Sequence, residues 1–262
     1  MAETKDYVPG TFCWIELMTS DPAAAKKFYG DILGWTGEDA PMPDGSSYTM
    51  LKLGGDDVGG LYQLGAEMKK MGVPPNWSAY VAVKDAGATA KQVAALGGKV
   101  VKDAFDVMDV GRMAVVQDPV GATFCLWQAN KHKGMAHFAP DRVGKPCWFE
   151  LLTPNVDRAI GFYGKLLGWK PEAMEMPGMK YNVLKLGEQP IGGAMEMNEQ
   201  MRQMKVPPHW LVYFQVAKCE DTVARAQKLG ARVLVPPMKV PTVGTFATLM
   251  DPQGAAFAVL AP

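Results

Sequence analysis

Two glutamates, Glu16 and Glu150, have the sequence setting best suited to chemistry. Each lies two positions after a tryptophan, in the strings Trp14-Ile-Glu-Leu and Trp148-Phe-Glu-Leu. Side chains two apart in a strand share a face, so each carboxylate is expected beside an indole ring. A carboxylate in such a setting can act as a general base or anchor a ligand, and both are predicted as catalytic residues. The alternative is a structural carboxylate satisfied by backbone donors or by a neighbouring Tyr or Arg.

The Trp-x-Glu-Leu string belongs to a repeat that runs through the whole chain. Trp14 and Trp148 are 134 positions apart, and the later Asp-Pro pairs at Asp118 and Asp251 are 133 apart. A period this long is a whole domain and not a solenoid unit. The sequence therefore predicts a tandem duplication. The expected parts are a first domain at 7–130, a linker at 131–143 and a second domain at 144–262.

The elements that position the first glutamate follow from local patterns. Residues 11–18 alternate and are rich in aromatic and β-branched types, which predicts a strand. Asp21, followed by Pro, is suited to open a helix, and Gly34 is suited to close it with a left-handed residue. Two further strands are expected at 48–53 and 58–61.

The same order of elements recurs within the copy. We expect a strand at 77–83, a helix at 85–96, and a hairpin whose turn is Asp118-Pro-Val-Gly. Each copy then holds two βαβββ modules and the chain holds four. The predicted fold class is α+β.

Composition limits the functions that remain. The 262 residues carry 27 Lys+Arg and 27 Asp+Glu, so the basic surface typical of nucleic-acid binding is not expected. No apolar run is long enough to span a bilayer, and no signal peptide is recognised at the start. The four cysteines show no Cys-x-x-Cys spacing, which argues against a zinc knuckle. We expect a cytoplasmic protein with free thiols.

Three features together resemble the vicinal-oxygen-chelate (VOC) superfamily of glyoxalases, extradiol dioxygenases and bleomycin resistance proteins. They are the paired modules, the Phe-Tyr-x-x-x-Leu-Gly-Trp strings that begin at Phe28 and Phe162, and the Asp-Pro-x-Gly turns. The sequence looks closest to tandem glyoxalase-like proteins. The resemblance implies two tandem VOC domains with curved mixed sheets. It says little of activity, because one scaffold hosts many chemistries.

The resemblance also implies a divalent metal held by His and Glu in a cup between the paired modules. The corresponding positions in the two copies are Trp14, Ser78, Cys125, Trp148, Leu211 and Ala258. None is His, Asp or Glu, and a divalent ion needs several oxygen or imidazole ligands. His132 and His137 fall in the linker and His209 at a strand edge, so they do not replace the missing set. We therefore predict no cofactor, with a divalent metal on unrecognised ligands as the alternative.

The residues expected to line the cups are mostly aromatic. Predicted ligand-binding residues are Trp14, Tyr80, Cys125, Trp148 and Tyr213. Each has a plainer interpretation, because an aromatic side chain commonly fills a core and a lone buried thiol is commonly inert.

Three functions are compatible with the sequence. The preferred one is a glyoxalase-like protein that binds a small organic molecule in each cup without the usual metal. The second is a metal-dependent lyase or dioxygenase of the glyoxalase or extradiol type. The third is a non-catalytic scaffold. The expected partner is a small molecule and not a nucleic acid or a membrane, and a homodimer is left open.

Overall fold

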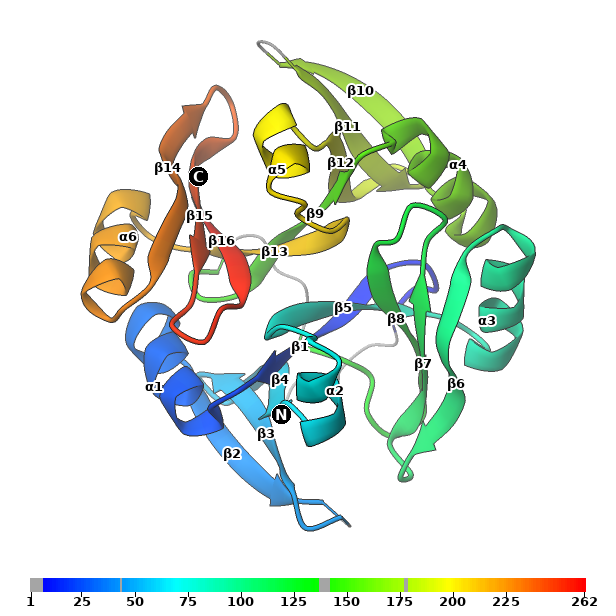
Figure 1. Ribbon diagram of the computed structural model, residues 1–262, viewed down its shortest axis with the longest axis horizontal. Helices are drawn as coiled ribbons and strands as arrows, with labels where there is room; N and C mark the ends of the chain where they lie inside the picture. Colours follow the sequence, from blue (N-terminus) through cyan, green and yellow to red (C-terminus); the bar gives the residue numbers. More distant parts are fainter. Residues whose placement is uncertain (1–6, 43, 137–141, 177–178) are drawn as a thin grey trace. The chain divides into compact units, whose positions relative to one another are not determined.

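The computed structural model describes residues 7–42, 44–136, 142–176 and 179–262. Over these residues the chain forms two mixed sheets of eight strands each, one from each sequence copy (Figure 1). The first sheet has the strand order β2-β3-β4-β1-β5-β8-β7-β6, and the second repeats it as β10-β11-β12-β9-β13-β16-β15-β14. The predicted α+β class with four βαβββ modules is confirmed.

The elements of the first copy match most of the predicted segments. They are β1 (Phe12–Thr19), α1 (Pro22–Leu33), β2 (Thr36–Pro41), β3 (Ser47–Leu53), β4 (Asp56–Gln63), α2 (Ala66–Lys70), β5 (Asn76–Ala82), α3 (Ala86–Ala95), β6 (Lys99–Val107), β7 (Gly111–Gln117) and β8 (Thr123–Ala129). Strand β2 was not predicted. All six of its residues are exposed, so it lacks the alternation of a half-buried strand.

The second copy repeats these elements in the same order. They are β9 (Pro146–Thr153), α4 (Val156–Leu167), β10 (Lys170–Met176), β11 (Met179–Leu186), β12 (Gln189–Glu196), α5 (Glu199–Gln203), β13 (His209–Gln215), α6 (Cys219–Lys228), β14 (Arg232–Val240), β15 (Gly244–Met250) and β16 (Ala256–Ala261). None of the described helices has both the length and the apolar character needed to cross a bilayer.

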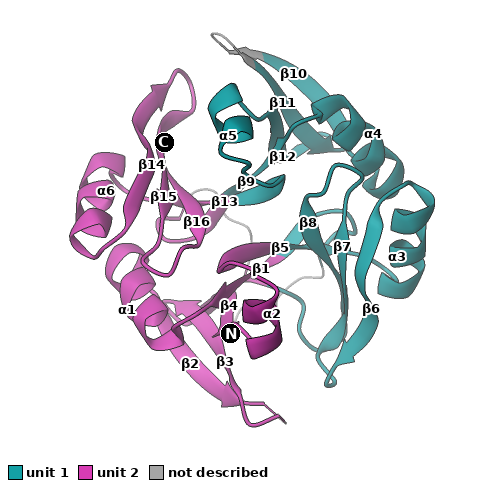
Figure 2. Ribbon diagram, viewed as in Figure 1, with its two compact units in different colours: residues 1–13, 79–134, 148–211 teal, residues 14–78, 135–147, 212–262 magenta. Residues whose placement is uncertain are grey.

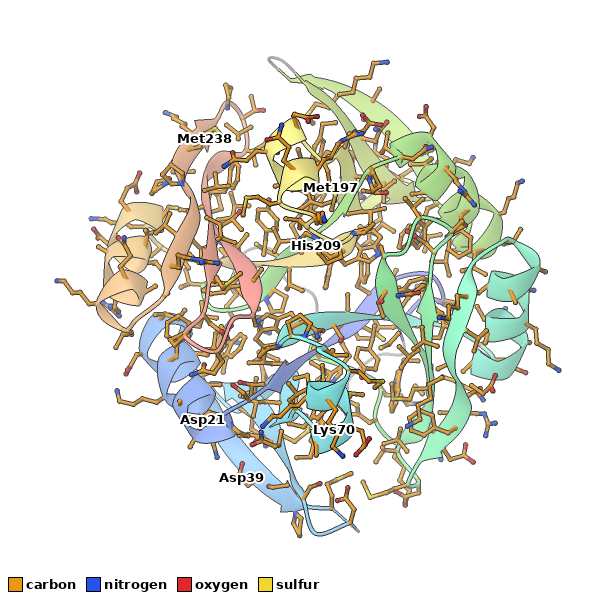
Figure 3. The ribbon with its side chains drawn as sticks, in the orientation of Figure 1. Asp21, Asp39, Lys70, Met197, His209 and Met238 are labelled. Carbon is orange, nitrogen blue, oxygen red and sulfur yellow. The ribbon has the colours of Figure 1, made fainter. Side chains whose placement is uncertain are left out.

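The predicted caps of α1 are present, and Figure 3 labels the first of them, Asp21. The Asp21 carboxylate accepts the Ala24 backbone N–H at 3.0 Å, and Pro occupies the first helical position. Gly34 ends the helix in the left-handed region with φ 76°. In α4, Asn155 and Gly168 have the same two roles. The helix boundaries were therefore encoded locally.

The chain divides into two compact units that do not coincide with the two sequence copies (Figure 2). One unit comprises residues 1–13, 79–134 and 148–211, and the other residues 14–78, 135–147 and 212–262. Each unit thus combines one module from each copy, a pairing that the sequence left open. We call them unit 1 and unit 2 in that order.

The core of unit 2 contains a hydrogen-bonded chain of motif residues. Trp77 Nε1 donates to Tyr29 Oη at 2.9 Å, and the Tyr29 hydroxyl donates to Asp251 Oδ2 at 3.0 Å. The other oxygen of Asp251 accepts three backbone N–H groups of its own hairpin turn. Burial and the nearby carboxylate raise the pKa of Tyr29 well above its usual value.

Unit 1 contains the equivalent chain. Trp210 Nε1 donates to Tyr163 Oη at 2.9 Å, and that hydroxyl donates to Asp118 Oδ2 at 3.1 Å. In both units the tyrosine comes from one copy and the Asp-Pro turn from the other. The Phe-Tyr and Asp-Pro-x-Gly motifs therefore join modules of different copies. Their role in the described structure is architectural.

Candidate functional site

Trp14 and Glu16 lie on β1 and meet Tyr48 from β3. Trp14 Nε1 donates a hydrogen bond to Tyr48 Oη at 3.2 Å, and the Tyr48 hydroxyl is hydrogen-bonded to Glu16. We call these three residues, all in unit 2, the first Trp–Tyr–Glu cluster. Trp14 is buried, whereas Glu16 and Tyr48 are half-buried.

A glycine makes this arrangement sterically feasible. Strand β4 lies between β3 and β1, so the Tyr48 side chain must cross β4 to reach Glu16. The register places Gly60 of β4 directly beside Glu16. A Cβ atom on Gly60 would lie 1.8 Å from Tyr48 Oη, which no side chain could occupy. The cluster therefore requires glycine at position 60.

The second copy builds the same cluster in unit 1. Trp148 Nε1 donates to Tyr181 Oη at 2.7 Å, and the Tyr181 hydroxyl is hydrogen-bonded to Glu150. Gly193 is paired with Glu150, and a Cβ there would lie 1.9 Å from Tyr181 Oη. We call Trp148, Tyr181 and Glu150 the second Trp–Tyr–Glu cluster. The same four residue types, in the same arrangement, occur in both copies, so the copies share side-chain geometry as well as sequence.

The direction of the hydrogen bonds follows from the donors present. An indole N–H can only donate, so the tyrosine oxygen accepts from tryptophan and gives its own proton to glutamate. Burial raises the pKa of Tyr48 well above its usual value, and the charge and hydrogen bond of Glu16 add to that shift. The pKa of Tyr181 is raised for the same reasons. Both tyrosines are therefore neutral donors at physiological pH.

The other predicted ligand-binding residues lie in the second module of each copy. Tyr80 and Cys125 are paired on β5 and β8 of unit 1 and are both buried, and Tyr80 Oη lies 4.0 Å from Met113 Sδ. Tyr213 in unit 2 is paired with Ala258 and packs near Phe246. These residues remain predictions. Tyr80 and Cys125 share a unit with the second cluster, and Tyr213 with the first.

Sequence reasoning missed Tyr48, Tyr181 and the two cluster glycines as parts of the site. The signal was present, because Tyr48 and Tyr181 are 133 positions apart, as are the Gly-Gly pairs that end at Gly60 and Gly193. These matches indicate the duplication, but they do not reveal the contact with the glutamates, because the glutamates lie on a strand that is not adjacent to the tyrosine strand.

The donor atoms do not fit the divalent metal that the resemblance implies. Among the described residues, no group of three or more His, Cys, Asp or Glu side chains could hold a metal ion. Trp14 and Trp148, at the expected ligand positions, use their ring nitrogens as hydrogen-bond donors. His209, at the start of β13 (Figure 3), has Nδ1 2.8 Å from the Pro207 carbonyl oxygen. His137 lies outside the described residues.

The chain is similar along its whole length to proteins of known family. Residues 14–127 match the glyoxalase-like domain, and residues 135–259 match the glyoxalase/bleomycin resistance protein/dioxygenase superfamily. A Mycobacterium tuberculosis protein named "Putative glyoxylase CFP32" is 41% identical over 100% of this chain and 98% of its own. The anthracycline biosynthesis protein DnrV of Streptomyces peucetius is 34% identical over 97% of this chain and 94% of its own.

Solved structures agree in fold. A Mn(II)-bound glyoxalase from Novosphingobium aromaticivorans aligns with a TM-score of 0.64 at 18% identity, over 97% of this chain and 82% of that one. The 2,3-dioxygenase LapB from Pseudomonas sp. KL28 aligns with a TM-score of 0.61 at 15% identity, over 96% of this chain and 92% of that one. At such identities the likeness concerns the fold alone. With its two matched domains and its full-length relatives, the chain belongs to the glyoxalase/bleomycin resistance protein/dioxygenase superfamily, as a tandem glyoxalase-like member.

Proposed function

We propose that this protein binds a small organic molecule at each Trp–Tyr–Glu cluster, and does so without a resident divalent metal. Glu16 and Glu150 anchor the ligand, and the neighbouring indole rings supply a flat apolar surface. The four cysteines are buried free thiols, which supports a reducing cytoplasmic setting.

The main support for this proposal is that the same polar cluster occurs at the equivalent place in each of the two sheets. Burying a carboxylate, a hydroxyl and an indole N–H costs free energy that an apolar core would avoid. In both copies the same four positions hold Trp, Glu, Tyr and Gly. Such groups are seldom kept for stability alone, since a buried polar network is often no more stable than hydrophobic packing.

The ligand class follows from the groups in the cluster. Tryptophan favours flat, apolar partners through its large ring face. One relative is named an anthracycline biosynthesis protein, and anthracyclines are polycyclic aromatic compounds, which supports an aromatic ligand for this chain. We therefore favour a small aromatic molecule over a sugar or a phosphate ester.

Isothermal titration calorimetry with a panel of aromatic metabolites tests the proposal. We expect at least one member to bind the wild-type protein, and the Glu16→Gln, Glu150→Gln double variant to bind it at least tenfold more weakly, as expected for a lost charge-assisted hydrogen bond. Failure of the whole panel to bind would contradict the binding function. Metal analysis of protein purified without chelator tests the second part, and one equivalent of divalent metal per domain would overturn it.

A further inference from the structure

We propose that Tyr48 and Tyr181 are positioning residues that set the ligand class: they fix Glu16 and Glu150 as hydrogen-bond acceptors, so that each cluster selects neutral molecules with O–H or N–H groups and rejects carboxylates. Phenols are the simplest members of the selected class. The inference rests on the proposed binding function and adds the rule by which ligands are chosen.

The hydrogen bonds within each cluster run in one direction, from tryptophan to tyrosine to glutamate. Tryptophan donates to tyrosine at 3.2 Å in the first cluster and at 2.7 Å in the second. The tyrosine proton is therefore directed to glutamate, and the chain of donors ends on carboxylate oxygens. An ionised carboxylate only accepts hydrogen bonds. A ligand that binds the glutamate directly must bring the proton.

The neighbours of each tyrosine hydroxyl fix the direction in which it donates. Each tyrosine ring crosses a glycine. Its hydroxyl lies within 2 Å of the place that a Cβ atom would take if the glycine were any other residue. The hydroxyl is also held by the tryptophan N–H. The hydroxyl is therefore held between the tryptophan N–H and the glutamate, and it orients the carboxylate that accepts its proton. A pre-oriented acceptor loses less side-chain entropy when a ligand binds.

The negative charge of the two glutamates also selects among ligands. Burial is the main cause of the raised pKa values of Tyr48 and Tyr181, and the negative charges of Glu16 and Glu150 add to the shift. The same charges act on any ligand beside the glutamates. Two carboxylates in direct contact repel each other, and the repulsion is stronger at partly buried positions than in bulk water. A carboxylate ligand is therefore excluded by charge as well as by its lack of a donor.

Two ligands of the same ring size test this rule: 2-naphthol, which is a neutral donor, and 2-naphthoate, which is an anionic acceptor at pH 7. Titration calorimetry measures both with the wild type and with the Tyr48→Phe, Tyr181→Phe double variant. We expect the wild type to prefer 2-naphthol by at least tenfold and the variant to lose about tenfold in 2-naphthol affinity, the value of one charged hydrogen bond. 2-Naphthoate should bind the double variant as weakly as it binds the wild type.

Two further variants separate positioning from general damage. Tyr62→Phe is the matched control, because the second copy has Met195 at this place and still builds its cluster. It should keep the wild-type preference. Glu16→Gln with Glu150→Gln removes the charge, and 2-naphthoate should then bind more tightly than to the wild type.

The possible results separate the two proposals. A preference unchanged by loss of the tyrosine hydroxyls would overturn the positioning role, and so would a wild type that binds 2-naphthoate as well as 2-naphthol. If another aromatic molecule of the panel binds but 2-naphthol does not, the donor rule fails and the binding function stands. If nothing binds, both fail.

Discussion

The two Trp–Tyr–Glu clusters contain the same residues but present different groups. In the first cluster Trp14 is 4% exposed and Glu16 is half-buried. In the second the order is reversed, with Glu150 7% exposed and Trp148 half-buried. The Trp–Tyr hydrogen bond is also longer in the first cluster, at 3.2 Å against 2.7 Å. The first cluster therefore exposes more of its carboxylate, and the second exposes more of its indole ring.

Neighbouring residues supply one structural difference between the clusters. Tyr48 is paired with Tyr62 on β4, whereas Tyr181 is paired with Met195 on β12. The difference indicates that duplication conserved the hydrogen bonds and let the surroundings diverge. Because Glu16 is half-buried and Glu150 is buried, we expect the first cluster to contribute more to ligand binding and the second more to stability.

The largest effect is expected where the clusters are alike. Gly60→Ala and Gly193→Ala each place a methyl group within 2 Å of the tyrosine hydroxyl and so displace the ring. Overpacking together with the lost hydrogen bonds should lower the free energy of unfolding by about 3 kcal/mol in each case. Urea unfolding measures this. Gly161→Ala in α4 is the control, because a Cβ there meets no atom within 4 Å.

Equal losses in the two glycine variants would confirm that both clusters depend on the same steric condition. A loss below about 1 kcal/mol in either glycine variant is within the range of ordinary surface substitutions and small repacking. It would show that the tyrosine ring can move to another position.

A smaller effect should separate the clusters. Glu150→Gln places an amide where the carboxylate is buried, and its N–H₂ group then needs an acceptor, so we expect a loss of about 1–2 kcal/mol in unfolding free energy. Glu16→Gln should cost less than about 0.5 kcal/mol, because Glu16 is half-buried and water can satisfy the amide. Aromatic ligand affinity should fall more in Glu16→Gln. The reverse order in both measurements would refute the division of roles.

The fold and the candidate site differed in how far the sequence predicted them. Helix α1 was delimited correctly because Asp21 and Gly34 act on backbone groups within three or four residues of themselves. The Tyr48–Glu16 hydrogen bond was not predicted, because it joins strands separated by β4 and depends on register. The pairing of Tyr29 with Asp251 was missed for a similar reason, since their modules belong to different copies.

Alkaline pH should affect the two clusters similarly. The pKa values of Tyr29, Tyr48, Tyr163 and Tyr181 are all raised, chiefly by burial. An unfolded tyrosine ionises near pH 10, so the folded state keeps protons that the unfolded state loses. The stability is thus fully present below about pH 10 and falls as the pH rises above it.

Absorbance at 295 nm follows tyrosine ionisation directly. Of the eight tyrosines, these four should remain protonated until the protein unfolds. Tyr48→Phe and Tyr181→Phe should each remove one tyrosine from the resistant group. Ionisation of more than four tyrosines in the folded protein would contradict the structure of at least one cluster.

The smallest effect concerns the indole rings and needs no ligand. Trp148 is half-buried, while the other six tryptophans are 2% to 6% exposed. A quencher in solution reaches an exposed ring far more often than a buried one, so acrylamide quenching of the folded protein should report mainly on Trp148. Trp148→Phe should abolish most of the quenchable fluorescence, and Trp14→Phe should leave it nearly unchanged. Equal effects of the two substitutions would mean that the clusters present their rings alike, and the asymmetry between the copies would then have to lie in the glutamates alone.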